Sequence, residues 1–443
     1  MEKKIQIVEN KMSEIESDMA INLKLKIFNF PVSLINSVRR TLLSDIPNVV
    51  FDKVVIHNNK TNAHNEFIKH RIKLIPIYRN EFWKILTYWD ESKEKRVWSF
   101  PDDLTIPKFS LDEKKKTSSS YNDNSIQEIL SNDFQIQLND SKLKTSDFFK
   151  KDLWTGDYIK IMILKNQTDH LKLEATPTIS FANVHSGFSP IGNVAYFYEK
   201  ESNTTIEEIK QMKFKQINKE RKNKNLHEFK LNSDEHTQFN ESFDLMDAQR
   251  IYVKNKHGEC SIINMDIESI GVIEPLQALI DAIFVLKLKV NDYLTKIIKD
   301  YKVQNEKIQF LNSTETQTTF LIHDETHTLG NLLTDYIRKL NDVFDKKVII
   351  LTNYKLVHPL EKILQFTIHI NDNAVQDIIT NKQIKTNKEI FLYLLTQAFK
   401  TIEKDLNQLF DKVVTKKINK ASFQIINQKK GGMGLDSDDE IIF

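Results

Sequence analysis

One pattern of strands and helices occurs twice along this chain, and the repetition restricts the fold more than any other feature. The first copy is an alternating strand over residues 21–27 followed by a helix that we expect Ser33 to cap. The second copy is a strand over residues 320–322 followed by a helix beginning at Thr328. Recurrence by chance is the alternative, because strand–helix patterns are common in mixed folds. The two helix starts nevertheless align locally, as Ser33-Leu34-Ile35-Asn36 and Thr328-Leu329-Gly330-Asn331.

Each of these two helices has one apolar face, and each copy ends in a longer helix, after Pro275 and from Ile390 to about Val413. An apolar face of this size has to be covered, so we expect the two copies to pack about a pseudo-two-fold axis. The predicted internal interface is formed by Leu34, Val38, Leu42, Leu329, Leu332, Leu333 and Tyr336.

The element order predicts an α+β fold with two related modules. The first module comprises residues 18–57 and 250–304, and the second comprises residues 305–425. An inserted, mainly β domain is expected over residues 58–249, and a flexible acidic tail over residues 426–443.

Three stretches stand apart from this pattern, and the two later ones read as loops or weakly ordered insertions. Residues 1–20 read as a polar leader. The segments Lys114–Ser125 and Glu201–Gln238 are rich in charged and amide side chains with few large apolar clusters, so we expect loops there.

The amino-acid composition excludes several classes of protein. The single cysteine, Cys260, excludes a disulfide framework and a cysteine-based zinc site, and it fits a reducing compartment. The net charge of +2 gives no general reason to expect nucleic acid as the main partner. The first residues contain no apolar stretch of the kind that a secretion signal needs. The most apolar window, residues 276–290, contains Asp281, Lys287 and Lys289, so we expect a core helix there and not a membrane span.

Several motifs suggest chemistry that their surroundings do not support. The histidines at positions 323 and 327 have zinc-site spacing but flank a strand end, so capping of the next helix is the favoured interpretation. Gly187 and Gly192 have phosphate-loop spacing without the required lysine. The carboxylates of Asp436–Glu440 follow a glycine-rich stretch, which favours a flexible tail over a magnesium site. The run Lys219–Lys224 is either a solvated face, a nucleic-acid backbone contact or a nuclear signal.

The first helix and four later segments resemble the alpha subunit of bacterial RNA polymerase and its archaeal D-type and eukaryotic equivalents. The similar segments are Ser33–Pro47, Phe51–Ile56, Glu66–Ile77, Asn183–Pro190 and Asp266–Gly271. The third is similar to the pattern EF-x-x-HRLGLIPL of that family.

The C-terminal part resembles the small L-type partner subunit. Thr326–Leu333 is nearly identical to a sequence motif of that family, and Tyr354–Glu361 is similar to its GY-x-x-PHPLE turn. The resemblance therefore implies D-type and L-type subunits fused in one chain, forming an internal pseudo-dimer rather than a homo-oligomer.

This resemblance implies a non-catalytic scaffold of DNA-directed RNA polymerase that supports transcription, with no catalytic, cofactor or metal residues of its own. Its implied partners are the two largest polymerase subunits and small accessory subunits, with DNA contacted only through the complex and no membrane involved. Arg39 and Arg40 lie off the apolar stripe, and the family uses this pair to dock the second-largest subunit. Composition alone would leave them as a solvated flank.

The fused arrangement resembles that of nucleocytoplasmic large DNA viruses, which implies the cytoplasmic viral factory and the virion as locations, with the nucleus as the alternative. Many relatives carry a cysteine cluster for zinc or iron–sulfur, which Cys260 alone cannot form.

Two other classes of function require features that the sequence does not offer. A freestanding DNA-binding transcription regulator would need a basic stripe or a recognition helix, and neither repeated helix has one. An enzyme in its own right would need a convergent set of nucleophile, base or metal ligands, which the sequence does not offer.

Overall fold

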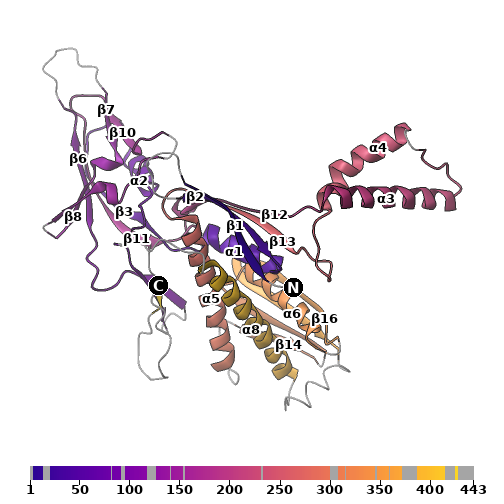
Figure 1. Ribbon diagram of the computed structural model, residues 1–443. Coiled ribbons are helices and arrows are strands. Elements are labelled where there is room, and N and C mark those ends of the chain that lie inside the picture. Colours follow the sequence, from indigo (N-terminus) through magenta and orange to yellow (C-terminus); the bar gives the residue numbers. More distant parts are fainter. Residues whose placement is uncertain are drawn as a thin grey trace. The chain divides into compact units, whose positions relative to one another are not determined.

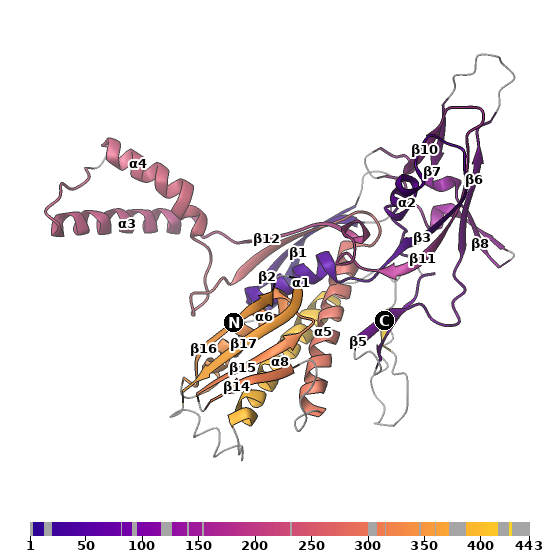
Figure 2. The same cartoon turned by 180° about the vertical axis from the view of Figure 1, so that it is seen from behind.

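A computed structural model gives the fold of the chain (Figures 1 and 2). It describes residues 3–12, 20–80, 82–90, 95–116, 126–139, 141–152, 155–230, 233–299, 308–314, 316–344, 347–358, 360–371, 387–414 and 425–427. The chain divides into two compact units. The first unit consists of Met1–Glu9, Lys24–Ile35 and Ala195–Asp266, and the second consists of Asn10–Leu23, Asn36–Val194 and Ile267–Phe443.

The first unit is built around a four-stranded sheet with the order β1-β2-β13-β12. Its strands are β1 (Lys4–Met12), β2 (Ala20–Phe28), β12 (Ile191–Tyr198) and β13 (Ile262–Ser269). The predicted alternation in β2 is confirmed, because Leu23, Leu25 and Ile27 are all buried. The leader expectation is wrong for residues 4–12, where Ile5 is a buried side chain of β1.

Two helices also belong to this unit, α3 (Asn203–Asn223) and α4 (Asp234–Ser242). They contradict the expectation of a loop over Glu201–Gln238. A loop was expected because this segment has few large apolar side chains, but local interactions stabilise its helices instead. The hydroxyl of Ser202 caps α3 by accepting a hydrogen bond from the backbone N–H of Thr205, at 3.2 Å, and basic residues occupy its last turn.

In the second unit, one antiparallel sheet has the order β14-β15-β17-β16. Helix α6 packs on β16 and β17, and α8 packs on both α6 and α5. Figures 1 and 2 both show α8 running alongside α5. The bounds are α5 (Pro275–Lys299), β14 (Ile308–Ser313), β15 (Gln317–His323), α6 (His327–Lys339), β16 (Ile349–His358), β17 (Glu361–Ile370) and α8 (Asn387–Val414).

The remainder of this unit is mainly β and is filled by aromatic side chains. Phe51, Phe109, Phe134 and Phe149 pack with ring centroids 5.1–6.4 Å apart. A five-stranded sheet has the order β3-β11-β6-β8-β9, β10 pairs with β7, and a small sheet has the order β18-β4-β5. The bounds are β3 (Asn48–Asn59), α2 (Asn65–Lys73), β4 (Ile85–Asp90), β5 (Lys95–Ser99), β6 (Lys108–Lys114), β7 (Gln127–Leu130), β8 (Gln135–Leu138), β9 (Ser141–Leu143), β10 (Lys160–Leu164), β11 (His170–Ser180) and β18 (Ile425–Asn427).

Short helical turns connect these elements. One-turn 3₁₀ helices lie at Ser131–Asp133, Thr145–Asp147, Ser186–Phe188, Ala248–Arg250 and Leu340–Asp342, and a π-helical turn lies at Phe243–Asp247.

The predicted α+β class is confirmed, since the described residues form helices together with several sheets. Most strand pairs in these sheets are antiparallel, and β18 pairs parallel with β4. The module boundaries stay a prediction. Residues 117–125 of the expected loop and 428–443 of the expected tail lie outside the described residues. Within the described ranges, no helix has the combination of length and apolar character that a membrane span needs.

Helix α6 lies so close to its sheet that one position requires glycine. A Cβ atom on Gly330 would lie 2.6 Å and 2.7 Å from two ring carbons of Tyr354, and 2.8 Å from a methyl carbon of Leu364. Both neighbours are side chains of the sheet beneath the helix, so either these side chains or the helix would have to shift.

We therefore expect Gly330→Ala to lower the free energy of unfolding. Overpacking costs about 1–3 kcal/mol, against roughly 1 kcal/mol of gained helix propensity. Chemical denaturation measures the difference. Asn331→Ala, at the exposed neighbouring position, is the matched control and should not destabilise the chain. A Gly330→Ala chain as stable as the Asn331→Ala chain would contradict the close packing.

Candidate internal interface and docking surface

The predicted interface residues of α1 (Val32–Ser44) are all buried. Leu34, Val38 and Leu42 are each no more than 1% exposed. The helix begins at Val32, so Ser33 lies in its first turn rather than capping it. The carbonyl of Pro31 accepts hydrogen bonds from the backbone N–H groups of the first turn instead.

The two arginines of α1 have different surroundings. Arg39 is half-buried, and its Nε donates to the side-chain oxygen of Asn36, at 3.0 Å. Arg40 is exposed, and its Nε donates to the hydroxyl of Thr328 at the start of α6, at 2.7 Å. The sequence predicted the outward position of this pair, and the structure adds a direct bond from Arg40 to the second repeated helix.

The interface residues of α6 are buried as well, with Leu329, Leu332, Leu333 and Tyr336 at most 2% exposed. The hydroxyl of Tyr336 donates to Oδ2 of Asp405 on α8, at 2.8 Å. Burial, together with the neighbouring carboxylate, raises the pKa of Tyr336 well above its usual value. The polar end of Tyr336 therefore binds α6 to α8, within the second predicted module.

A buried carboxylate just before α6 connects it to α5. Glu325 is 2% exposed and follows Asp324, whose φ of 61° makes the chain turn sharply. One oxygen of Glu325 accepts a hydrogen bond from the hydroxyl of Tyr293, at 2.8 Å, and the other forms an ion pair with Lys289, also at 2.8 Å. Both partners lie on α5, so this segment joins two helices that are distant in sequence.

The electrostatics of this cluster follow from its burial. Burial, and then the charge of Glu325, raises the pKa of Tyr293 well above its usual value. Burial lowers the pKa of Lys289, but the carboxylates of Glu325 and Asp45 outweigh that effect, so the pKa is raised overall. Lys289 stays charged beside Glu325, and Tyr293 stays protonated, as both contacts require.

Two further contacts hold α5 against α8. The rings of Tyr293 and Phe399 stack with centroids 5.6 Å apart and an angle of 11° between their planes. The ammonium of Lys287 lies 4.5 Å from the ring centre of Phe410.

The other side of α5 binds the mainly β part of the chain. Arg79 and Asp281 form an ion pair at 2.7 Å in which both side chains are almost completely buried. Burial raises the pKa of the Asp281 carboxyl, and Arg79 opposes that shift. Near the other end of the helix, Arg96 donates to both carboxylate oxygens of Asp292. Sequence reasoning missed both pairs, because their members are about 200 positions apart and no local pattern marks them.

Two motifs singled out in the sequence, one by glycine spacing and one by charge, have structural roles. Gly187 lies in a 3₁₀ turn where an added Cβ would come within 2.2 Å of Leu74, so glycine allows close packing there. Lys219–Lys224 forms the last turn and cap of α3, where Arg221 lies over the ring of Phe229 at 4.2 Å. The Asp436–Glu440 segment lies outside the described residues.

Comparison with known protein families gives two matches. Residues 24–290 and residues 317–412 each match a model described as the RNA polymerase Rpb3/Rpb11 dimerisation domain. The first match alone covers more than half of the chain. The chain belongs to the Rpb3/Rpb11 dimerisation domain family. It carries that module twice, which confirms the duplication predicted from the repeated helices.

Individual relatives match shorter stretches. DNA-directed RNA polymerase subunit Rpo3 of Aeropyrum pernix is 36% identical over 62 residues, which is 14% of this chain and 22% of the relative. Subunit 3 of DNA-directed RNA polymerases II, IV and V of Arabidopsis thaliana is 37% identical over 67 residues, 15% of this chain and 20% of the relative. The human RPAC1 subunit of polymerases I and III is 27% identical over 74 residues, 17% of this chain and 21% of the relative. The chain therefore matches about a fifth of the length of these relatives.

The contacts described above join the two family modules. Arg40 and Lys289 lie within the first matched region, and their partners Thr328 and Glu325 lie within the second. One hydrogen bond thus connects the two Rpb3/Rpb11 regions directly, together with one ion pair between a buried carboxylate and a lysine whose side chain is 33% exposed.

Removing the hydroxyl of Tyr293 tests the cluster around Glu325. Tyr293→Phe keeps the ring that stacks on Phe399 but leaves one oxygen of a buried carboxylate without its donor. A hydrogen bond to a charged group contributes about 1.5–3 kcal/mol, so the free energy of unfolding should fall by that amount. Tyr158→Phe, at a partly buried ring of the same unit, is the matched control and should change little. Equal effects of the two substitutions would show that Glu325 does not depend on Tyr293.

Proposed function

We propose that the chain is a non-catalytic scaffold subunit of a DNA-directed RNA polymerase. In this role its two Rpb3/Rpb11 modules form an internal pseudo-dimer, and the pseudo-dimer nucleates docking of the two large catalytic subunits. The relatives, which are named as polymerase subunits, support the assignment to this enzyme. Transcription is then carried out by the partners, with DNA contacted only through the complex.

The main support for the proposal is the direct contact between the two modules inside one chain. The ion pair of Lys289 with Glu325, the hydrogen bond of Arg40 to Thr328 and the packing of α5 on α8 all cross between them. Separate subunits would associate in a concentration-dependent way. A covalent connection makes the same association intramolecular, at an effective concentration on the order of millimolar for a short linker. The scaffold is therefore assembled as soon as the chain folds.

Docking of the second-largest subunit is proposed to use Arg39 and Arg40. Arg40 is exposed and Arg39 half-buried, and both lie off the buried stripe of α1. A guanidinium can still bind a carboxylate in two-point geometry while one of its nitrogens is engaged locally. The proposal extends to a viral source, with the cytoplasmic viral factory and the virion as locations, supported by the resemblance of the fused arrangement to that of large DNA viruses.

Changing both arginines to alanine tests the docking role. Exposed polar contacts contribute about 0–1 kcal/mol, so the double variant should fold and melt as the unchanged chain does. Losing a charge-assisted contact at the interface costs about 2–5 kcal/mol, so a tagged variant should recover much less of the large subunits from its native source. Mass spectrometry of the co-purified proteins measures this.

Thr328→Val is the control that separates docking from the internal bond. It removes the partner of Arg40 but leaves both arginines in place, so it should assemble normally. If Thr328→Val lost assembly as severely as the double variant, Arg40 would act through the internal contact. Normal recovery of the large subunits by the double variant would contradict the docking role.

A further inference from the structure

The α3–α4 hairpin of the first unit is held together by its own contacts. Figure 1 shows the two helices folding back on each other. Lys210 forms an ion pair with Asp244, at 3.1 Å, and Lys213 forms a close ion pair with Asp247. Both lysines also lie within 6 Å of the ring centre of Phe243, which is buried. These contacts stabilise the hairpin internally, and they engage two of its lysines.

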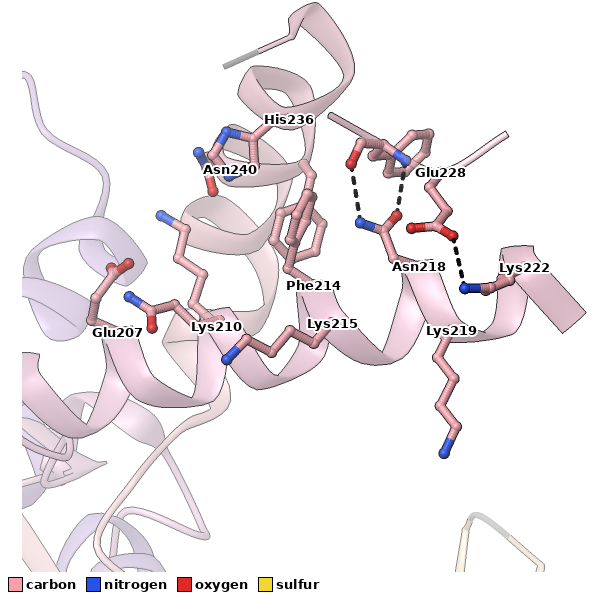
Figure 3. A pocket seen from close by; sticks show the side chains of 13 residues that line it. Glu207, Lys210, Phe214, Lys215, Asn218, Lys219, Lys222, Glu228, His236 and Asn240 are labelled. Atoms are coloured by element: carbon pink, nitrogen blue, oxygen red, sulfur yellow. Dashed lines mark hydrogen bonds and ion pairs between the residues drawn. The ribbon is translucent and has the colours of Figure 1, made fainter. Parts of the chain in front are cut away.

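A groove of about 780 Å³ lies between the two helices (Figure 3). Its aromatic wall is formed by Phe214, which is 9% exposed, and by Phe239 and His236 of α4. The ring of Phe214 lies 4.7 Å from that of His236 and 5.4 Å from that of Phe239. The volume is sufficient for two or three large side chains, and the wall offers them apolar contact.

The α3 rim of this groove is basic. Lys215 and Lys219 are exposed, lie one helical turn apart and have no acidic partner among the described residues. Lys222, one turn further, is 3.8 Å from Glu228, with both side chains more than half exposed, so their attraction is weak. Figure 3 shows Lys219 extending away from α4 while Phe214 points towards it. The rim therefore offers cations beside an apolar wall.

The far end of the groove is fixed in place. The side-chain amide of Asn218 donates to the carbonyl of Phe229, at 3.0 Å, and accepts from its backbone N–H, at 2.9 Å. This pair of bonds, visible in Figure 3, holds the connecting segment against α3. A groove with a fixed end needs little reordering when a ligand binds.

We propose that this groove binds an acidic amphipathic segment of a partner protein, with carboxylates on Lys215 and Lys219 and large apolar side chains against Phe214 and Phe239. Such a segment complements both the lysine charges and the apolar wall of the groove. A nucleic-acid strand fits less well, because it carries a negative charge at every nucleotide, whereas a peptide can place uncharged side chains beside Glu207 and Glu228, which also line the groove.

The test is fluorescence anisotropy with the full chain and a labelled 18-residue peptide that repeats Asp-Asp-Phe-Glu-Glu-Leu. We expect saturable binding to the unchanged chain. Lys215→Glu with Lys219→Glu should weaken binding at least tenfold, because two attractive charges become repulsive. A peptide with serine in place of phenylalanine and leucine should also bind at least tenfold more weakly, since it cannot fill the groove.

The matched control is Lys142→Glu with Lys256→Glu, which reverses two exposed lysines outside the groove and should leave binding unchanged. Thermal melting of both double variants should match that of the unchanged chain, because all four lysines are exposed. The proposal fails if the peptide does not bind, if both double variants weaken it equally, or if a 20-nucleotide single strand binds more tightly than the peptide. This result is independent of recovery of the large subunits, which depends on Arg39 and Arg40.

Discussion

The second unit depends on two ion pairs that α5 forms around buried carboxylates, each of which needs an opposite charge beside it. Removing a charged group from water costs several kcal/mol, and a buried pair repays this only with good geometry. Asp281 is 3% exposed and is matched by Arg79, and Lys289 is matched by Glu325, which is 2% exposed. One matching group comes from the mainly β part and the other from the second family module. Helix α5 therefore reaches its native surroundings only when both of those parts are in place.

This arrangement suits the proposed scaffold. A protein that presents surfaces to large partners must keep those surfaces in fixed positions, because any reordering on binding would reduce affinity. Buried pairs are demanding in their geometry, so they fix one arrangement of helices while contributing little net stability themselves. The apolar packing of α5, α6 and α8 provides the stability, and the paired charges at Glu325 and Asp281 specify which surfaces meet.

Periodic features of this fold could be predicted from the sequence, whereas contacts between distant segments could not. The helices at Ser33 and Thr328 were predicted because their apolar residues recur at helical spacing, and every predicted interface residue is buried. Helix α3 was missed, because its stability comes from the cap at Ser202 and from ion pairs rather than from an apolar stripe. The segment between His323 and His327, which contains Glu325, was expected only to cap the next helix, because nothing near it in the sequence reveals that Tyr293 and Lys289 lie beside Glu325. Which side chains of Leu34, Val38 and Leu42 contact α6 stays a prediction.

Hydrogen exchange on α5 in the full chain tests most directly whether the two modules fold as one. In a chain carrying Leu332→Asp and Leu333→Asp, carboxylates replace two completely buried side chains of α6, which opens the second module. We expect the backbone amides of residues 275–299 then to exchange much faster than in the unchanged chain, although the sequence of α5 itself is unaltered. Fast exchange confined to α6, α8 and their sheet, with α5 as protected as before, would contradict the dependence of α5 on the second module.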